Sequence, residues 1–473
     1  MSSDGMNSRR SSGMQRSLLA IGAMLVLIAG LSTWSAGLNG PYQFDDYVTP
    51  LGDPASQSLD AWGTFLPRTL RPATKLSYAL EAEAGLSGQP AARRVVSFML
   101  FALAAVLLGL LIARLEPRAA PFGALMLAAV WFLHPVQADS VLLLSGRTAL
   151  LSAVFLLIAL LALERSRPLL SAILFVLACL ARETALAGLL PLAALAASRP
   201  GVSTRSVLRE LSPILAGAAL ALLWMLTTPR YLQLAEFSLL GRPFWHSFFS
   251  QVGAVPLGLD LLLHPVRLSV DYGLPLPGKA TDPLFLFGLG LYLAAAAGIV
   301  LLLRRSRIAA VGLALWLAAL LPTQSLIPKL DALSNRPLSL ALAGLLLLAA
   351  PILLTAFEGV RGKASKSAAT GSAIFPAGPG LAAGVVALAL LVPLAGASVQ
   401  RAELFRTELS LWQDAAAKSS ANPRPHMQYA ALLHRAGRNR EAREALSAAQ
   451  AIDPFSSQIA AMAKAYQPEE VSQ

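Results

Sequence analysis

Long apolar blocks, separated by short clusters of Arg and Lys, constrain the fold of this chain more than any other feature. A helix needs roughly 20 mostly apolar residues to cross the hydrocarbon core of a bilayer, and many of the blocks approach that length. With 56% hydrophobic and 14% charged residues, the sequence lacks the polar surface that a soluble domain of this size requires. Because the bilayer core holds no water, each block must satisfy its own backbone hydrogen bonds, which a helix does. The sequence therefore predicts an all-α, polytopic membrane protein.

The basic clusters predict how the helices are oriented. They fall between apolar blocks, as the positive-inside rule expects for cytoplasmic turns, so the net charge of +12 indicates membrane topology and no nucleic-acid partner. We expect residues 1–16 to be cytoplasmic and 17–38 to be a retained anchor. The transmembrane domain, 17–398, is predicted to cross the bilayer about eleven times, at 17–38, 95–113, 120–133, 148–163, 168–180, 185–198, 211–228, 284–303, 308–321, 338–356 and 378–398. The shorter apolar segment 249–263 is predicted to be interfacial or re-entrant.

This topology predicts which segments lie outside the cytoplasm. The outer segments are 39–93, 134–147, 229–283 and 322–337, and the charged, helix-forming tail, 399–473, lies on the same side. Within the tail, 423–456 has the spacing of one tetratricopeptide repeat. A single repeat cannot bury its faces alone, so it needs neighbouring helices, a protein partner or the membrane domain. We expect the outer compartment to be the periplasm of a bacterial inner membrane.

The first outer segment carries two adjacent carboxylates, Asp45 and Asp46. Repulsion between two adjacent carboxylates, together with partial desolvation near a membrane surface, can raise one carboxyl pKa of such a pair toward the working range of a general base. The alternative interpretation is a solvated turn, since Asn39-Gly40-Pro41 just before the pair is turn-forming. Asp45 and Asp46 are the candidate catalytic residues.

The second outer segment brings His134, Asp139 and Arg147 together at the end of a predicted helix. Ionisable residues at such a position are costly, which favours a binding function. The alternative is that His134 only caps its helix. The remaining histidines and the single cysteine, Cys179, show no metal-ligand spacing, and no Walker loop or Ser-His-Asp set is present.

Two further sites place charge beside predicted spans. Arg182 and Glu183 separate two apolar helices, where they either form an ion pair that orients the turn or contact substrate. Arg336 precedes a span on the outer side, against the positive-inside bias. An arginine in that position indicates an anionic partner such as a lipid phosphate.

Taken in order, these motifs resemble the transmembrane and tetratricopeptide-repeat O-mannosyltransferase family, whose members are membrane glycosyltransferases of GT-C type. The matching elements span nearly the whole chain: Phe44-Asp45-Asp46, Arg71 to Tyr78, Leu133 to Asp139, Ser145-Gly146-Arg147, Arg182-Glu183-Thr184, Pro265 to Tyr272, Asn335 to Leu338, and Leu411-Trp412. The chain departs from the family at several points. The family usually has Glu in place of Asp139 and Lys in place of Arg182, and it has an Asn-x-x-x-His element where Ser97 and Phe101 stand here. The family tail often holds many repeats, whereas this tail holds one recognisable repeat. The resemblance implies a GT-C transmembrane fold followed by a tetratricopeptide-like tail.

The resemblance also implies a reaction, in which a sugar passes from a polyprenyl-phosphate donor to a protein or glycan hydroxyl on the outer face. Asp45 or Asp46 then acts as the base, and Arg336 holds the lipid phosphate, with Arg147 or Arg182 as alternatives. Asp139 would orient the acceptor or help hold a divalent cation, and no other cofactor is expected. Two other functions stay open: a non-catalytic scaffold that recruits partners through the tail, and a transferase that modifies polysaccharide or lipid glycans. A transporter would show repeated halves, which the sequence lacks.

Overall fold

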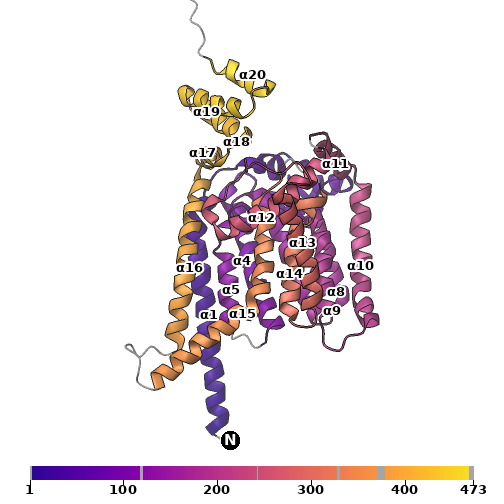
Figure 1. Ribbon diagram of the computed structural model, residues 1–473, viewed down its shortest axis with the longest axis vertical. Coiled ribbons are helices and arrows are strands. Elements are labelled where there is room, and N and C mark those ends of the chain that lie inside the picture. The colour runs from indigo at the N-terminus through magenta and orange to yellow at the C-terminus, as the bar shows by residue number, and fades with distance from the viewer. Residues whose placement is uncertain (1–2, 118–120, 242, 328–330, 370–378, 468–473) are drawn as a thin grey trace, which may run out of the picture.

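The structure is a helical bundle with a smaller group of helices beyond one end (Figure 1). The computed structural model describes residues 3–117, 121–241, 243–327, 331–369 and 379–467. Every regular element within these ranges is helical, and they contain no strand. The prediction of an all-α protein is confirmed.

Eight helices of the described residues are long and apolar enough to cross a membrane, or nine if a bent pair counts as one span. The eight lie in α1 (Ser3–Leu38), α4 (Pro90–Leu115), α7 (Arg147–Glu164), α10 (Thr204–Thr227), α13 (Pro283–Leu302), α14 (Arg307–Leu320), α15 (Asn335–Ala369) and α16 (Pro379–Glu403). The bent pair joins α5 (Pro121–Phe132) to the segment Pro135–Val141, which ends in α6 (Ala138–Val141), at an angle of 55°. The chain is therefore a multi-pass integral membrane protein.

The difference from the predicted eleven crossings lies in two short helices. The predicted spans 168–180 and 185–198 correspond to α8 (Pro168–Ala181) and α9 (Leu189–Ala197). At 14 residues, α8 is about 21 Å long, which is less than the hydrocarbon thickness of a typical bilayer. Both helices nevertheless pack inside the bundle, α8 against α7 and α10 and α9 against α14.

The helices separate into a central set and a peripheral set. Within their most apolar windows, α7 is 83% buried and α14 is 89% buried, so they form the centre. The corresponding values for α1, α10, α13 and α16 lie between 22% and 28%. Because these outer helices are apolar as well as exposed, their free faces are suited to lipid.

Helix starts follow local sequence signals. Pro90, Pro168 and Pro283 occupy the first turn of their helices, where the missing N–H costs nothing. A side chain also caps the start of α13, where Asp282 accepts from the N–H of Leu284.

The remaining helices lie at the tail end of the bundle, meaning the end that carries the C-terminal helices (Figure 1). They are α2 (Leu59–Phe65), α3 (Pro72–Glu83), α11 (Pro229–Gly241) and α12 (Phe244–Leu263), followed by the tail helices α17 (Glu408–Lys418), α18 (Arg424–Arg435), α19 (Asn439–Ile452) and α20 (Ser457–Ala465). Short 3-10 or π-helical segments lie between the helices along the chain: η1 (Phe44–Asp46), η2 (Tyr47–Leu51), η3 (Pro54–Ser56), η4 (Leu66–Arg68), η5 (Pro135–Gln137), η6 (Leu144–Gly146), η7 (Glu183–Gly188), η8 (Pro265–Arg267), η9 (Pro322–Leu326) and η10 (Leu404–Arg406). Helix α12 is longer than the predicted 249–263 and is not among the candidate spans.

The tail has a small core of its own. Helices α18 and α19 turn at Gly437, whose φ of 74° falls in the left-handed region that glycine adopts without strain. Ala430, Ala442, Leu446 and Ala449 are buried between the helices of this group. These are the positions that the repeat pattern predicts to be small or apolar; assignment of the pair as a tetratricopeptide repeat stays a prediction.

Candidate active site

A cavity of about 490 Å³ lies at the tail end of the bundle. Its wall combines the first outer segment, the turn after α8, helix α11, and the stretches around residues 271 and 331–336. The charged side chains that line it are three arginines and five carboxylates: Arg71, Arg182, Arg336, Asp45, Asp139, Glu183, Asp271 and Asp331. Segments distant in sequence thus bring most of the predicted site residues to one place.

Asp45 and Arg336 form the ion pair at the centre of this site. The Nη2 atom of Arg336 lies 2.9 Å from Oδ2 of Asp45 and donates a second bond of 2.9 Å to Oγ of Ser145. Arg336 belongs to the first turn of α15, so the start of a spanning helix positions it. The Asp45 side chain is 42% exposed and therefore accessible to a substrate.

Asp46 has a different environment from its neighbour. Its side chain is fully buried, and Oδ1 accepts a 2.9 Å bond from the N–H of Ser145. Burial raises the pKa of Asp46 above its ordinary value, against the opposing effects of the Ser145 N–H and of the Arg94 guanidinium. Asp46 thus ties the first outer segment to the 134–147 loop, and of the acidic pair it is Asp45 that lines the cavity.

Two residues of the cavity wall have left-handed backbone conformations that are rare outside glycine. They are Phe44, with φ 52°, and Arg71, with φ 56°. Such conformations cost about 1–3 kcal/mol each and persist only where the surroundings impose them. For Phe44, one such contact is an edge-on aromatic pair with Trp412 of the tail, with ring centroids 5.4 Å apart.

Arg71 and Glu183 form a two-pronged ion pair across the cavity wall. The Arg71 Nε and Nη2 atoms lie 2.8 and 2.6 Å from the two carboxylate oxygens of Glu183. The sequence predicted an ion pair at 182–183, and the partner of Glu183 is instead the distant Arg71. Arg71 was missed as a site residue; the available signal was an arginine in an outer segment, against the positive-inside bias.

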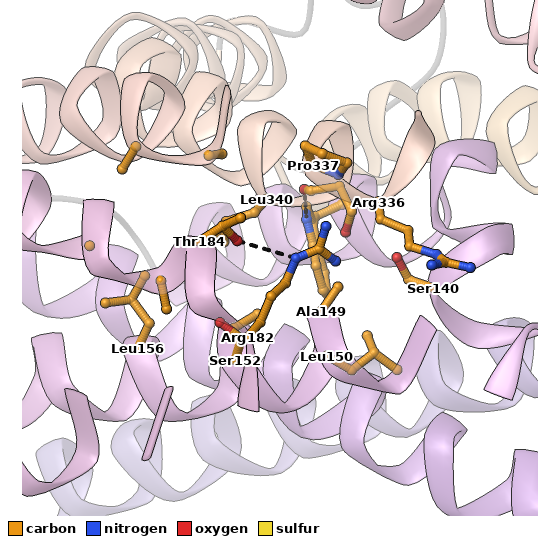
Figure 2. A pocket seen from close by; sticks show the side chains of 17 residues that line it. Ser140, Ala149, Leu150, Ser152, Leu156, Arg182, Thr184, Arg336, Pro337 and Leu340 are labelled. Atoms are coloured by element: carbon orange, nitrogen blue, oxygen red, sulfur yellow. Dashed lines mark hydrogen bonds between the residues drawn. The ribbon is translucent and has the colours of Figure 1, made fainter. Parts of the chain in front are cut away.

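Arg182 is a buried cation that makes no ion pair with any described residue. Its Nε donates a 3.2 Å bond to Oγ1 of Thr184. Burial and the nearby Arg71 lower the pKa of Arg182. Together with Arg336 it also lines a smaller adjoining pocket of about 40 Å³ (Figure 2). A buried guanidinium without a carboxylate is well suited to receive an anion.

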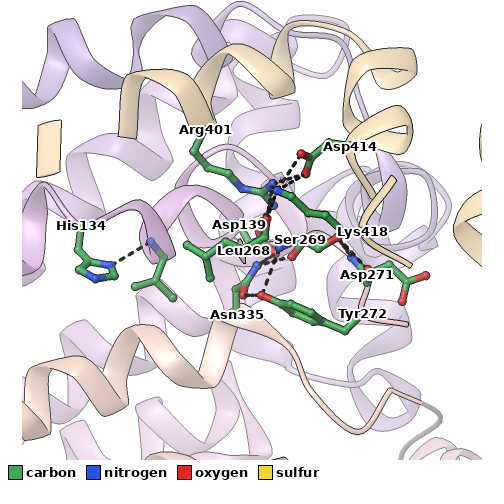
Figure 3. A network of polar contacts seen from close by, with 11 residues as sticks. His134, Asp139, Leu268, Ser269, Asp271, Tyr272, Asn335, Arg401, Asp414 and Lys418 are labelled. Carbon is green, nitrogen blue, oxygen red and sulfur yellow. Dashed lines mark hydrogen bonds and ion pairs between the residues drawn. The ribbon is translucent and has the colours of Figure 1, made fainter. Parts of the chain in front are cut away.

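Asp139 connects the cavity to the tail through a network of polar contacts (Figure 3). Its Oδ2 accepts a 2.9 Å bond from Asn335, and its Oδ1 lies 3.5 Å from Nη2 of Arg401. Arg401 in turn lies 3.0 Å from Asp414 on α17, which also pairs with Lys418. The carboxylate of Asp139 is therefore held between the bundle and the tail. Among the described residues, no group of three or more His, Cys, Asp or Glu side chains is placed to hold a metal ion.

His134 and Arg147 lie outside the cavity wall. The Nδ1 atom of His134 accepts from the N–H of Val136 and so caps the turn η5 that follows it, whereas the alternative interpretation had His134 cap the predicted helix before it. Arg147 is fully buried, with Nη1 2.5 Å from Glu81 and Nε 3.1 Å from Oγ of Ser97. Both side chains hold outer segments together.

Fold and site together define a multi-pass helical membrane protein with a charged cavity at one end of its bundle. Comparisons with protein-family models and with characterised proteins give no match. Among solved structures, the chain is similar to the oligosaccharyltransferase AglB of Archaeoglobus fulgidus in complex with an inhibitory peptide and a dolichol-phosphate. The sequence identity is 15%, the TM-score is 0.47, and the match covers 83% of this chain and 56% of that one. It is also similar to the apo form of an oligosaccharyltransferase from the same organism, with 16% identity, a TM-score of 0.46, and coverage of 81% and 56%. The chain spans about half the length of these proteins.

Proposed function

We propose that this protein is a membrane glycosyltransferase that moves a sugar from a polyprenyl-phosphate donor to a hydroxyl acceptor on the extracytoplasmic side. The observation that carries the proposal is the convergence of an accessible carboxylate, Asp45, with Arg336 and Arg182 around one cavity; Arg182 makes no ion pair within the part of the chain that the structure describes. A base for the acceptor and cations for a leaving phosphate are what this transfer requires.

Asp45 is the proposed base. The acceptor oxygen forms a bond to the anomeric carbon of the sugar while its proton passes to the Asp45 carboxylate. The bond between that carbon and the phosphate oxygen breaks, and polyprenyl phosphate leaves with the electron pair. Asp46 is buried and bonded to Ser145, so its proposed role is to hold the turn that presents Asp45.

Arg182 and Arg336 are the proposed phosphate clamp. Among the described residues no carboxylate forms an ion pair with Arg182, so an arriving phosphate supplies a direct counter-charge for this buried cation. Arg336 is shared: it pairs with Asp45 in the resting structure and can move to the phosphate, which leaves the Asp45 carboxylate free to accept a proton. Arg147, the other candidate from the sequence, is committed to Glu81.

Helix α11 is the proposed contact for the lipid part of the donor. It contributes Leu234 and Phe237 to the cavity wall, and it also exposes Leu232 and Leu240. An apolar helix that lines a charged cavity on one side and is open on the other suits a ligand with a phosphate head and an isoprenoid chain.

The test is glycan transfer in membranes by Asp45→Asn, Asp46→Asn and the double variant. We expect Asp45→Asn to lower transfer by about 10²-fold or more, the usual range for a lost general base, and Asp46→Asn to keep most of the transfer per folded molecule. Asp60→Asn, an exposed carboxylate of the same outer segment, is the matched control. Full transfer by both the Asp45→Asn and the double variant would remove the assigned base, as expected of a non-catalytic scaffold.

A further inference from the structure

The end of the bundle away from the tail carries many arginines and few carboxylates. Three connecting segments lie at this end (Figure 1): 164–168 between α7 and α8, 198–210 from the end of α9 into α10, and 303–307 between α13 and α14. Together they contain eight arginines and two glutamates, with no Lys, Asp or His. A surface with this balance of charge attracts anions.

Ion pairs hold the three segments together. The Nη2 atom of Arg307, at the start of α14, lies 2.6 Å from Oε2 of Glu164 at the end of α7. Arg199, after α9, pairs with Glu210 of α10 and also donates to the carbonyl oxygen of Leu163. These contacts connect α7, α9, α10 and α14 at one place, and they engage both glutamates.

The other six arginines of these segments are exposed, and none forms an ion pair with any residue that the structure describes. We call them the basic face: Arg165, Arg167, Arg205, Arg209, Arg304 and Arg305. Because the ion pairs tie the segments to one another, the backbone has little room to spread the positive charges apart. A bound anion relieves the repulsion that remains.

Exposed apolar side chains lie next to the basic face. Each lies within four residues of one of its arginines: Leu169 and Leu170 on α8, Leu208 on α10, and Val300 and Leu301 on α13. Helices α10 and α13 are candidate spans, so these side chains stand where a membrane helix meets the edge of the bilayer. A membrane topology signal requires only positive charge on this side. The tied segments and the adjoining apolar side chains are further features, and they suit a ligand with both phosphate and hydrocarbon.

We propose that the basic face binds anionic phospholipid from the adjacent leaflet, with lipid phosphates at the arginines and acyl chains along α8, α10 and α13. This binding does not depend on the transfer reaction proposed above. Arginine holds phosphate oxygens through parallel N–H donors, and each basic residue close to an anionic membrane surface adds roughly fivefold to the affinity. A nucleic acid also offers phosphates, but it would leave the exposed leucines in water.

The test titrates two lipids with the same acyl chains, phosphatidylglycerol and phosphatidylcholine, into the purified full-length protein in detergent and counts bound lipid by native mass spectrometry. The test variant replaces four arginines of the basic face with glutamine, and a second variant replaces the same four with lysine: Arg165, Arg167, Arg304 and Arg305. The lysine variant keeps the positive charge that directs membrane insertion. The matched control replaces four exposed basic residues at the tail end with glutamine: Arg68, Lys279, Arg435 and Arg440.

We expect the parent protein to bind phosphatidylglycerol roughly tenfold or more tightly than phosphatidylcholine. The glutamine variant should lose this preference, the lysine variant should keep part of it, and the tail-end control should keep all of it. Equal affinity of the parent for the two lipids would overturn the proposal, as would an equal loss in the tail-end control. Because the comparison of the two lipids uses the parent protein, it decides the matter even if the glutamine variant does not fold. Tighter binding of a short DNA duplex than of phosphatidylglycerol to the parent, lost in the glutamine variant, would also overturn it.

Discussion

Replacing Trp412 should disturb catalysis through the position of Asp45, although Trp412 does not line the cavity. Its ring packs edge-on against Phe44, at an interplanar angle of 68°. Phe44 has a left-handed backbone and directly precedes Asp45. The same turn is held from the tail by a 2.6 Å bond from Gln43 to the Phe405 carbonyl.

The magnitude follows from these contacts. An aromatic pair contributes about 0.5–1.5 kcal/mol beyond burial, and the left-handed backbone costs about 1–3 kcal/mol, so losing the ring removes much of what holds Phe44 in place. When the turn relaxes, Asp45 moves relative to Arg336, and a displacement of about 1 Å can lower a rate by as much as 10²-fold. We expect Trp412→Ala to lower kcat by roughly 10- to 100-fold with little change in the donor KM, and Trp412→Phe to keep most of the activity.

The assay measures kcat and KM in nanodiscs, normalised to folded protein, for Trp412→Ala, Phe44→Ala and the double variant. The double variant should be no slower than Trp412→Ala, because both changes break one contact. Leu411→Ala is the control: it is buried on the same helix, so it destabilises the protein, but activity per folded molecule should persist. The reasoning would be refuted if the losses in kcat of the two single variants multiplied in the double variant. A change confined to KM would refute it as well.

Arg182→Met should weaken binding of polyprenyl phosphate by about 10-fold or more, since a hydrogen bond to a charged group contributes roughly 1.5–3 kcal/mol. Arg182→Lys should retain part of the affinity. Titration of polyprenyl phosphate into nanodiscs that contain each variant measures both affinities. Glu183→Gln leaves the guanidinium of Arg71 without its counter-charge and should lower the midpoint of thermal unfolding. Adding Arg71→Met to this variant should restore part of the lost stability. Equal unfolding midpoints for the single and the double variant would contradict this. Gly273→Ala should loosen the tail, because its Cβ meets Ser419, and limited proteolysis should cut the tail faster while the bundle stays intact.

Much of the membrane domain could be predicted from local sequence. The apolar run of α4 and the helix of α7 reveal themselves by length and hydropathy alone. Hydropathy could not decide whether the short helices α8 and α9 cross the membrane. An apolar helix that is enclosed by other helices has the same sequence pattern as a membrane span. Hydropathy indicates that a segment is shielded from water, but it does not show whether lipid or protein surrounds that segment.

The candidate site was predictable in part. Unusual charges near predicted spans pointed to Asp45, Asp139, Arg182 and Arg336, which the structure gathers in one cavity. Distinguishing Asp45 from Asp46 was beyond the sequence, because it depends on which neighbour meets the Ser145 N–H, 99 positions away from Asp46. Such contacts arise from packing between segments, and no local pattern encodes them.

The contribution of the tail to the site was also hidden in the sequence. Arg424 begins α18, a charged helix whose residues would ordinarily be solvated, and Arg401 lies near the end of the apolar spanning helix α16. In the structure they contact Asp139, Asp271 and Asp331, all of which line the cavity. Long-range ion pairs of this kind become visible only once the fold places the tail beside the outer segments.

In the reaction proposed above, this protein consumes a polyprenyl-phosphate sugar by means of Asp45. The most direct measurement follows a panel of labelled polyprenyl-phosphate sugars with the purified protein in nanodiscs and records sugar transferred and polyprenyl phosphate released. We predict equal amounts of the two products for at least one donor, and loss of both in Asp45→Asn while Asp60→Asn is unaffected. A folded protein that releases no polyprenyl phosphate from any donor, or releases it equally well without the Asp45 carboxylate, would contradict the claim.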